Sequence, residues 1–353
     1  MKKSQARPNW AVWAVLCTLA VNLCGCATAN ATLGSARIDP ADVRIADSVF
    51  TAVVDNAEDR LPGYAAAVGI GDRILYSRAA GLADIEARRV ATTQTRFRIY
   101  SASKTMGATA AMMLAESGQL DLDAPVSTYL PDLPAEVGRV TARQIMAHRS
   151  GIRHYREGEW DRVSDTNCAN PGEALADFVH DPLEFAPGSD YRYTTFGYVL
   201  LSAVVEAAAG QPFDDFVRKR IFEPAGMTAT AIEGRPVRGF NVAAFYDRNG
   251  AGEFSLTSGI DASCKFFGGG LVSTAEDMVR FGLALVNGKL VGPASLQQML
   301  TVHSEGGGNY PPYGYGFFPG DGLTTTFEVP LEDYVPNWWH GGNGRGGYSV
   351  LMI

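Results

Sequence analysis

The stretch RFRIYSASKTMGATAAMMLAESG, residues 96–118, decides the fold, because it places a lysine inside a segment that otherwise reads as buried. At helical spacing, apolar side chains cover every face of this segment, and Gly118 is suited to end the helix. A helix that is apolar on all sides belongs in a core, where an ammonium is costly unless something compensates for its lost hydration. Lys104 is therefore either paired or present for its chemistry.

The sequence around Lys104 suggests what that chemistry is. Ser101 lies three residues earlier and so on the same side of the predicted helix. A serine needs a proton acceptor before it can attack a carbonyl, and a lysine accepts a proton only when burial lowers its pKa well below about 10.4. The helix N-terminus also favours an oxyanion beside the backbone N–H of Ser101. Ser101 and Lys104 are therefore predicted as nucleophile and base.

The composition of the chain strengthens this prediction. A Ser-x-x-Lys pair alone arises by chance about once in a chain of this length. Of the 30 basic residues, however, only six are lysines and the other 24 are arginines. A chain that uses arginine for ordinary positive charge has a lysine here, and lysine, unlike arginine, can lose its proton.

The rest of the chain predicts an α+β fold. Its 353 residues are 46% hydrophobic and carry a formal charge of -8, which indicates one or two globular domains and no nucleic-acid surface. A helix is predicted at 40–57 and a hairpin at 63–84 that turns at Gly71–Asp72, and the last residues are again β-prone. We expect a domain over 38–353 with an antiparallel sheet formed from both chain ends, flanking helices, and a helical subdomain inserted at about 125–250. No metal-binding spacing emerges, and we predict no cofactor.

Four stretches together carry a family resemblance: residues 95–134, 141–155, 191–213 and 267–288. In sequence and order they resemble the serine β-lactamase family, in its penicillin-binding and class C-like branch, from about Pro40 to the last residue. The resemblance implies a β-lactamase/transpeptidase-like fold and hydrolysis through an acyl-enzyme on Ser101.

The same resemblance implies roles for residues far from Ser101. Tyr193 begins a Tyr-Thr-Thr segment in the place of the family's Tyr-x-Asn, and it would relay protons between Lys104 and the leaving group. Thr195 replaces the asparagine. His340 to Gly342 match the histidine form of the third motif, and the backbone N–H of Asn343 would complete the oxyanion site with that of Ser101.

The departures from the family pattern bear on the substrate. Thr195 lacks the amide that contacts the substrate in relatives, and His340 is mostly neutral at pH 7 where lysine would be charged. This combination resembles the mitochondrial serine β-lactamase-like proteins and related esterases, so we expect an ester, peptide or β-lactam-like acyl substrate. A true β-lactamase or D-Ala-D-Ala carboxypeptidase is the first alternative, and a non-catalytic binder of cell-wall peptide is the second.

The N-terminus reads as an export signal over residues 1–26, because a basic region precedes a short apolar run. Residues 23–26, LCGC, resemble a bacterial lipobox, which implies a lipidated Cys26 and a tether at 27–37. Ordinary cleavage near Ala29 is the alternative. We expect a membrane-anchored lipoprotein in the periplasm.

Export also affects the interpretation of the remaining residues. Cys168 and Cys264 are then the cysteines of the mature domain, and both a disulfide and two separate buried thiols are compatible with the sequence.

The family usually continues beyond the equivalent of Ile353 through further strand and a C-terminal helix, so the resemblance implies that these 353 residues are a fragment. The sequence makes no prediction of oligomeric state.

Overall fold

The computed structural model describes residues 39–57, 61–159, 167–235, 241–249, 252–257, 261–308, 310–320 and 337–353. The predicted signal at 1–26, with Cys26, and the tether at 27–37 lie outside the described residues. In the described part of the chain, no helix combines the length and the apolarity that a bilayer crossing needs.

The N-terminal region folds as the sequence predicts. Helix α1 runs over Pro40–Ala57, and strands β1 (Gly63–Ile70) and β2 (Arg73–Asp84) form an antiparallel hairpin. Its turn lies at Gly71–Asp72, where Gly71 takes a φ of 64°, a conformation that favours glycine. Strand β3 (Arg89–Val90) pairs with β2.

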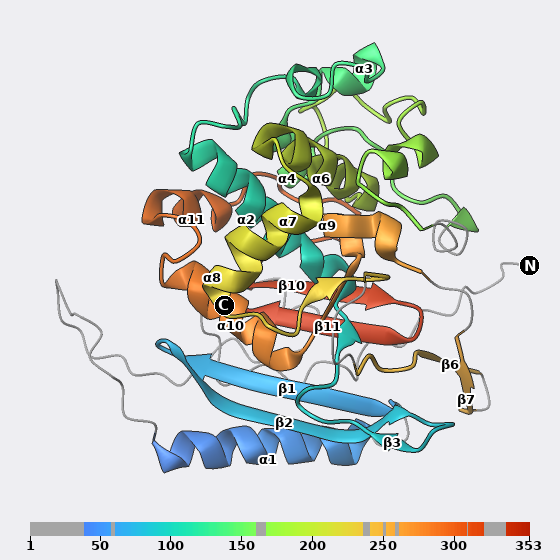
Figure 1. The fold of residues 1–353 in the computed structure, drawn as a ribbon, viewed down its shortest axis with the longest axis vertical. Coiled ribbons are helices and arrows are strands. Elements are labelled where there is room, and N and C mark those ends of the chain that lie inside the picture. The colour runs from blue at the N-terminus through green and yellow to red at the C-terminus, as the bar shows by residue number, and fades with distance from the viewer. Residues whose placement is uncertain are drawn as a thin grey trace, which may run out of the picture.

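Helices cover both faces of this hairpin (Figure 1). Helix α1 packs on β2, and the Tyr76 hydroxyl donates a hydrogen bond of 3.0 Å to Asp47 on the helix. Helix α10 (Ala275–Val286) packs on the other side, where an added Cβ at Gly69 would lie 2.5 Å from Val279. Glycine is required at position 69 because helix and strand approach so closely.

The C-terminal strands form a second sheet. Strand β10 (Trp338–Gly344) pairs antiparallel with β11 (Gly347–Met352) on one side and with β9 (Phe318–Pro319) on the other. The sequence predicted one sheet from both chain ends. In the described residues the two ends instead form two three-stranded antiparallel sheets, and helix α10 contacts both β1 and β11. The fold class is confirmed, since the mixture of helices and antiparallel sheet is the expected one.

The helical part of the molecule lies beyond the C-terminal sheet, at the opposite end from the hairpin (Figure 1). It contains α3, α4 and α6, and most of it lies in the predicted range of 125–250. The elements within residues 125–250 are η2 (Val126–Thr128), α3 (Ala135–Gly138), α4 (Ala142–Met146), η3 (Glu173–Asp177), α6 (Thr195–Ala209), α7 (Phe213–Val217), the π-helical turn η4 (Arg218–Phe222), α8 (Glu223–Ala225), β5 (Ala231–Ile232) and β6 (Tyr246–Arg248). Of these, α8 contacts α10, and β6 lies beside the end of the hairpin, where the Tyr246 hydroxyl accepts a hydrogen bond from the backbone N–H of Ile85.

The apolar helix of the opening stretch is α2 (Ser103–Glu116), and it is buried along almost its whole length. It follows β4 (Phe97–Arg98) and the 3₁₀ turn η1 (Tyr100–Ala102). An added Cβ at Gly107 would lie 2.9 Å from Phe267, so α2 packs tightly on α9. The predicted end is confirmed, because Gly118 adopts a φ of 71° just past the helix.

A small sheet of order β4-β8-β5 connects the start of α2 to the second half of the chain. Phe97 pairs with Ser273 and Ala231 with Val272. This pairing places η1 beside α9, the two segments from which the candidate site is built. The elements not yet given are β7 (Phe254–Leu256), η5 (Ser263–Lys265), α9 (Phe266–Gly269), β8 (Leu271–Ser273) and α11 (Pro293–Met299).

Candidate active site

Ser101 lies in the 3₁₀ turn that leads into α2, and Lys104 lies in the first turn of that helix. Lys104 Nζ is 3.0 Å from Ser101 Oγ. The structure therefore brings the predicted nucleophile and base into hydrogen-bond contact through local helical geometry.

The residue before Ser101 has a strained backbone. Tyr100 is buried and has a φ of 43°, in the left-handed region that bulky residues avoid. Its hydroxyl donates a hydrogen bond of 2.5 Å to the carbonyl of Arg345, and its ring fills the space beside Gly344, where an added Cβ would lie 2.3 Å from the ring. These contacts hold Tyr100 in this conformation and so direct Ser101 towards Lys104.

The Lys104 side chain has no exposed surface. Burial holds its pKa well below the ordinary value, and the nearby positive charge of Lys265 lowers it further. Its nitrogen donates a hydrogen bond of 2.6 Å to the carbonyl of Gly268 and lies 3.4 Å from Thr195 Oγ1. A neutral amine has two N–H groups and one lone pair, so these two oxygens leave the lone pair for the Ser101 hydroxyl.

Gly268 can approach this closely because it has no side chain. An added Cβ there would lie 2.7 Å from the Thr195 side chain, on α6, so α9 packs directly on the start of that helix. The three consecutive glycines at 268–270 stand out in the sequence, but nothing in the sequence predicts that the carbonyl of the first one accepts a hydrogen bond from Lys104.

Tyr193 lies just before α6, whose N-terminus is capped by Thr194. The centroid of the Tyr193 ring lies 4.9 Å from Lys104 Nζ. Burial raises its pKa well above the ordinary value, and a hydrogen bond with Ser101 opposes this only in part. Tyr193 is therefore a neutral phenol that can donate one proton while it accepts another.

Tyr193 also forms part of an aromatic wall. Tyr310 stacks on it with centroids 4.5 Å apart and planes 5° apart, although the Tyr310 side chain remains 42% exposed. Phe318 from β9 lies on the same cluster, with its centroid 6.4 Å from that of Tyr193. Sequence analysis did not identify Tyr310, because 117 positions separate it from Tyr193 (310 minus 193).

His340 reaches the site from β10 and is 1% exposed. Its Nδ1 lies 2.7 Å from the carbonyl of Gly341, and the described residues provide no partner for its Nε2. Burial, reinforced by Lys104, lowers its pKa to about 3. The imidazole is therefore neutral at pH 7, as expected from its reference pKa, and its centroid lies 6.3 Å from that of Tyr193.

The next residues of β10 pass directly over η1. An added Cβ at Gly342 would lie 2.0 Å from the carbonyl oxygen of Ile99, so only glycine fits there. Ser349, which pairs with Gly342, donates a hydrogen bond of 2.6 Å to the same oxygen. Gly342 therefore allows the strand to approach the nucleophile, and the exposed Asn343 follows it.

Two further histidines surround Tyr193. His154 Nδ1 accepts a hydrogen bond of 3.3 Å from the backbone N–H of Thr195, and burial lowers its pKa to about 3. His148 is fully buried with its ring centroid 4.3 Å from that of Tyr193 and has a φ of 57°. Sequence analysis missed His154, since a lone histidine in a loop carries no distinguishing pattern.

Arg345 does not point at the site. Its guanidinium pairs with Asp247 of β6, with Nη2 2.6 Å from Oδ2. The sequence could not give this direction, because the two residues are 98 positions apart.

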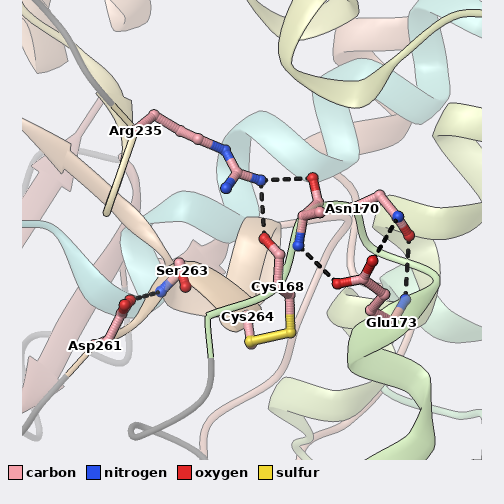
Figure 2. Close-up of a disulfide and its surroundings, with 8 residues drawn as sticks. Cys168, Asn170, Glu173, Arg235, Asp261, Ser263 and Cys264 are labelled. Atoms are coloured by element: carbon pink, nitrogen blue, oxygen red, sulfur yellow. Dashed lines mark hydrogen bonds between the residues drawn. A yellow bond between two sulfur atoms is a disulfide. The ribbon is translucent and has the colours of Figure 1, made fainter.

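The structure joins Cys168 and Cys264 in a disulfide (Figure 2). The bond links the loop before η3 to η5, directly before α9. In the described residues, no group of three or more His, Cys, Asp or Glu side chains is arranged to hold a metal ion.

Comparison of this chain with known proteins identifies relatives in one protein family. The beta-lactamase family profile matches residues 47–353. The human mitochondrial serine beta-lactamase-like protein LACTB is 32% identical over 298 residues, which cover 65% of this chain and 54% of that protein. Esterase EstB of Burkholderia gladioli is 30% identical over 354 residues, which cover 86% of this chain and 88% of the esterase.

Solved structures show the same fold. A penicillin-binding protein from Bacillus halodurans superposes with a TM-score of 0.68 at 25% identity, covering 85% of this chain and 89% of that one. The chain spans only about half the length of its human mitochondrial relative.

Proposed function

This chain belongs to the beta-lactamase family of serine hydrolases, and from that premise we propose that it cleaves ester or amide bonds through an acyl-enzyme on Ser101. Lys104 acts as the base and Tyr193 as the proton relay. The observation that carries the proposal is the 3.0 Å contact between Ser101 Oγ and the Lys104 amine, whose pKa burial holds well below its ordinary value.

In acylation, the Ser101 hydroxyl proton passes to Lys104 Nζ while Oγ forms a bond to the substrate carbonyl carbon. The bond from that carbon to the leaving oxygen or nitrogen then breaks. The leaving group takes the proton that Lys104 received, through Tyr193, which gives its own proton and accepts another. Tyr193 is suited to this relay because it contacts both Ser101 and Lys104.

In deacylation, the same groups work in reverse. A water molecule gives a proton to Lys104 through Tyr193 and attacks the acyl carbon, and Ser101 Oγ leaves with a proton. The negative charge on the carbonyl oxygen in both steps would be stabilised by the N-terminal end of α2 at Ser101 and by the backbone N–H of Asn343.

The charges of the site favour a substrate without a carboxylate next to the cleaved bond. The pKa of His340 is about 3, and Arg345 is paired with Asp247. Neither residue therefore offers a ready positive charge at pH 7 to an anionic group of the kind that β-lactams and D-Ala-D-Ala peptides carry. The aromatic wall of Tyr193, Tyr310 and Phe318 favours an apolar acyl or leaving group instead.

The experiment that tests this proposal combines a label with kinetics. We expect a fluorophosphonate probe to label the wild-type protein and to leave Ser101→Ala unlabelled, with both proteins equally folded by circular dichroism. Steady-state kinetics should show hydrolysis of nitrophenyl butyrate and slow or absent turnover of nitrocefin. A folded wild type that no probe labels would favour the non-catalytic binder. A nitrocefin kcat/KM within about 10⁴–10⁸ M⁻¹s⁻¹ and negligible esterase activity would favour a true β-lactamase.

A further inference from the structure

The residues on the two sides of Tyr193 are both held by one residue, His148. The backbone N–H of Arg192 donates a hydrogen bond of 2.8 Å to the His148 carbonyl, and the backbone N–H of Thr194 donates one of 3.2 Å to His148 Nδ1. The main chain and the side chain of His148 therefore fix the backbone before and after the residue proposed as the proton relay.

The one hydrogen bond that the described residues provide for the His148 ring is the bond from Thr194. The ring is fully buried, and its Nε2 has no hydrogen-bond partner in the described part of the chain. It packs against the rings of Tyr193, Tyr198 and Tyr313, with centroid distances of 4.3, 5.2 and 4.6 Å. Because Nδ1 accepts a hydrogen bond, it carries a lone pair, so the ring is a neutral imidazole with its proton on Nε2.

His148 occupies a backbone position that ordinarily takes glycine. Directly after α4, the N–H of His148 donates a hydrogen bond of 3.0 Å to the Ile145 carbonyl, and that of Arg149 donates one of 2.7 Å to the Gln144 carbonyl. These are the two hydrogen bonds of a Schellman motif, in which the left-handed residue is usually glycine. His148 has this conformation, with a φ of 57°. The turn itself does not call for a histidine, so we look to the contacts of its ring for the reason.

The helix that precedes His148 is anchored at both ends. It begins with a capping box, in which Gln144 N–H donates to Thr141 Oγ1 at 3.2 Å and Thr141 N–H donates to Gln144 Oε1 at 3.0 Å. At its other end, the Met146 carbonyl accepts a hydrogen bond of 2.9 Å from the Tyr198 hydroxyl of α6. Helix α4 packs beside α6 (Figure 1). His148 therefore connects Tyr193 to a well-held element.

We propose that His148 is a positioning residue for the hydrolytic reaction: its carbonyl and its Nδ1 hold the backbone on both sides of Tyr193, and its ring packs on the Tyr193 ring, so that the phenol stays beside Lys104. The proposal rests on the proposed function, because it assigns to His148 the support of the relay in that reaction. Protonation of the leaving group then depends on the His148 side chain.

The first test varies the leaving group. Nitrophenolate leaves as a stable anion without a proton, whereas ethanol leaves only with the proton that Tyr193 would supply. The ratio of kcat/KM for nitrophenyl butyrate to kcat/KM for ethyl butyrate therefore reports proton transfer through Tyr193. Both esters give the same acyl-enzyme, so differences in deacylation do not enter the ratio. A loss of folded protein lowers both values equally and cancels.

Two variants separate the hydrogen bond from the turn. His148→Gly suits the left-handed backbone but removes the ring, whereas His148→Asn also tolerates this backbone and places an oxygen acceptor where Nδ1 was. We expect the ratio to rise about tenfold in His148→Gly, to rise further in Tyr193→Phe, and to stay within about twofold of the wild type in His148→Asn. His180→Gly, on the exposed surface, is the matched control and should leave the ratio unchanged.

The other outcomes contradict the proposal in distinguishable ways. A ratio that rises in Tyr193→Phe but not in His148→Gly would overturn the positioning role alone. Equal rises in His148→Gly and His148→Asn would also overturn it, because the acceptor would then have no effect. A ratio that rises in neither Tyr193→Phe nor His148→Gly would refute the relay of the proposed function as well.

The second test does not depend on activity or on the glycine variant folding. In wild-type protein labelled with ¹⁵N-histidine, the chemical shift of each ring nitrogen distinguishes an unprotonated acceptor from an N–H, and His148→Asn assigns the signals of position 148. At pH 7 we expect an unprotonated Nδ1 and a protonated Nε2. A protonated Nδ1 could not accept from Thr194 and would overturn the proposal. If the acyl probe does not label the wild type, the proposed function fails, while this measurement still decides whether His148 holds Thr194.

Discussion

Lys104 Nζ is held 2.6 Å from the carbonyl oxygen of Gly268, a residue 164 positions away in the sequence. An obligate acceptor at this distance takes one N–H of the amine, and this fixes the direction in which the remaining groups of the nitrogen point. The Ser101 hydroxyl lies in one of those directions. Burial lowers the pKa of Lys104, but it is the Gly268 carbonyl that orients its amine.

The first prediction is that Lys104→Arg inactivates the enzyme. Arginine retains a positive charge but does not act as a base near neutral pH, so ester hydrolysis should fall by about 10³-fold or more. The measurement is kcat/KM on nitrophenyl butyrate. Lys219→Arg, on the exposed surface, is the matched control and should retain wild-type activity. Substantial hydrolysis by Lys104→Arg would contradict proton transfer to this residue.

The second prediction concerns the close approach of β10 to η1. An added Cβ at Gly342 would lie 2.0 Å from the Ile99 carbonyl, so Gly342→Ala must displace the strand that carries His340. We expect a loss of about 1–3 kcal/mol in the free energy of unfolding and a clear fall in kcat. Gly341→Ala is the control, since its Cβ would meet nothing closer than Trp339 at 3.3 Å. Equal effects at the two positions would argue against a tight contact.

The third prediction is that His340 makes the protein less stable in acid. Its pKa is about 3 in the folded state and about 6.5 in the unfolded chain, so the unfolded state binds more protons between these values. The free energy of unfolding should therefore be largest above pH 6.5 and fall towards pH 3, by about 1.4 kcal/mol per pH unit for this residue. Urea denaturation at several pH values should show a shallower fall in His340→Gln. Identical slopes would mean that His340 titrates normally in the folded state.

The fourth prediction is that the Cys168–Cys264 disulfide stabilises the domain. It closes a long loop, with a sequence separation of 96, for which chain entropy alone suggests an upper value of about 4–5 kcal/mol. Cys264→Ser should lower the free energy of unfolding by about 2–5 kcal/mol. Reduction with dithiothreitol should destabilise the wild type to a similar extent and leave Cys264→Ser unaffected. A wild type insensitive to reduction would show that the bond does not form.

The fifth prediction concerns the N-terminus. We expect Cys26 to be lipidated, so cells fed a labelled fatty acid should label the wild-type protein and not Cys26→Ser. Cys24→Ser is the matched control, because the second lipobox-region cysteine is expected to leave with the signal. Unlabelled wild-type protein recovered free in the periplasm would instead indicate ordinary cleavage.

Much of the local structure followed from pattern alone. The 3.6-residue period marked α1 at Pro40–Ala57, and the alternation around Gly71–Asp72 marked the first hairpin with its turn. The contact between Ser101 and Lys104 was also predictable from local sequence, since a spacing of three residues along a helix brings two side chains to the same side. Each of these features depends on residues that are near one another in the chain.

The residues that complete the site escaped prediction for the opposite reason. Gly268, His154 and Tyr310 could not be connected with the site from the sequence, because their roles lie in contacts with distant residues. The Gly268 carbonyl accepts from Lys104, 164 positions away, and His154 and Tyr310 contact Thr195 and Tyr193. The single sheet expected from both chain ends likewise depended on long-range pairing, and in the described residues the strands of the two chain ends belong to two separate sheets. Family resemblance supplied Tyr193 and His340, which composition and periodicity would have left in the core.

The sequence by itself therefore determined the secondary structure near the nucleophile and the burial of a lysine beside a serine, because helical periodicity and apolar composition act over a few residues. Only the tertiary structure decided what surrounds that lysine. Hydrogen-bond directions, the passage of β10 over Ile99 and the pairing of Arg345 with Asp247 depend on which distant segments pack together. That packing depends on how side chains from the whole chain fill the core together, so it cannot be predicted from any single stretch of sequence.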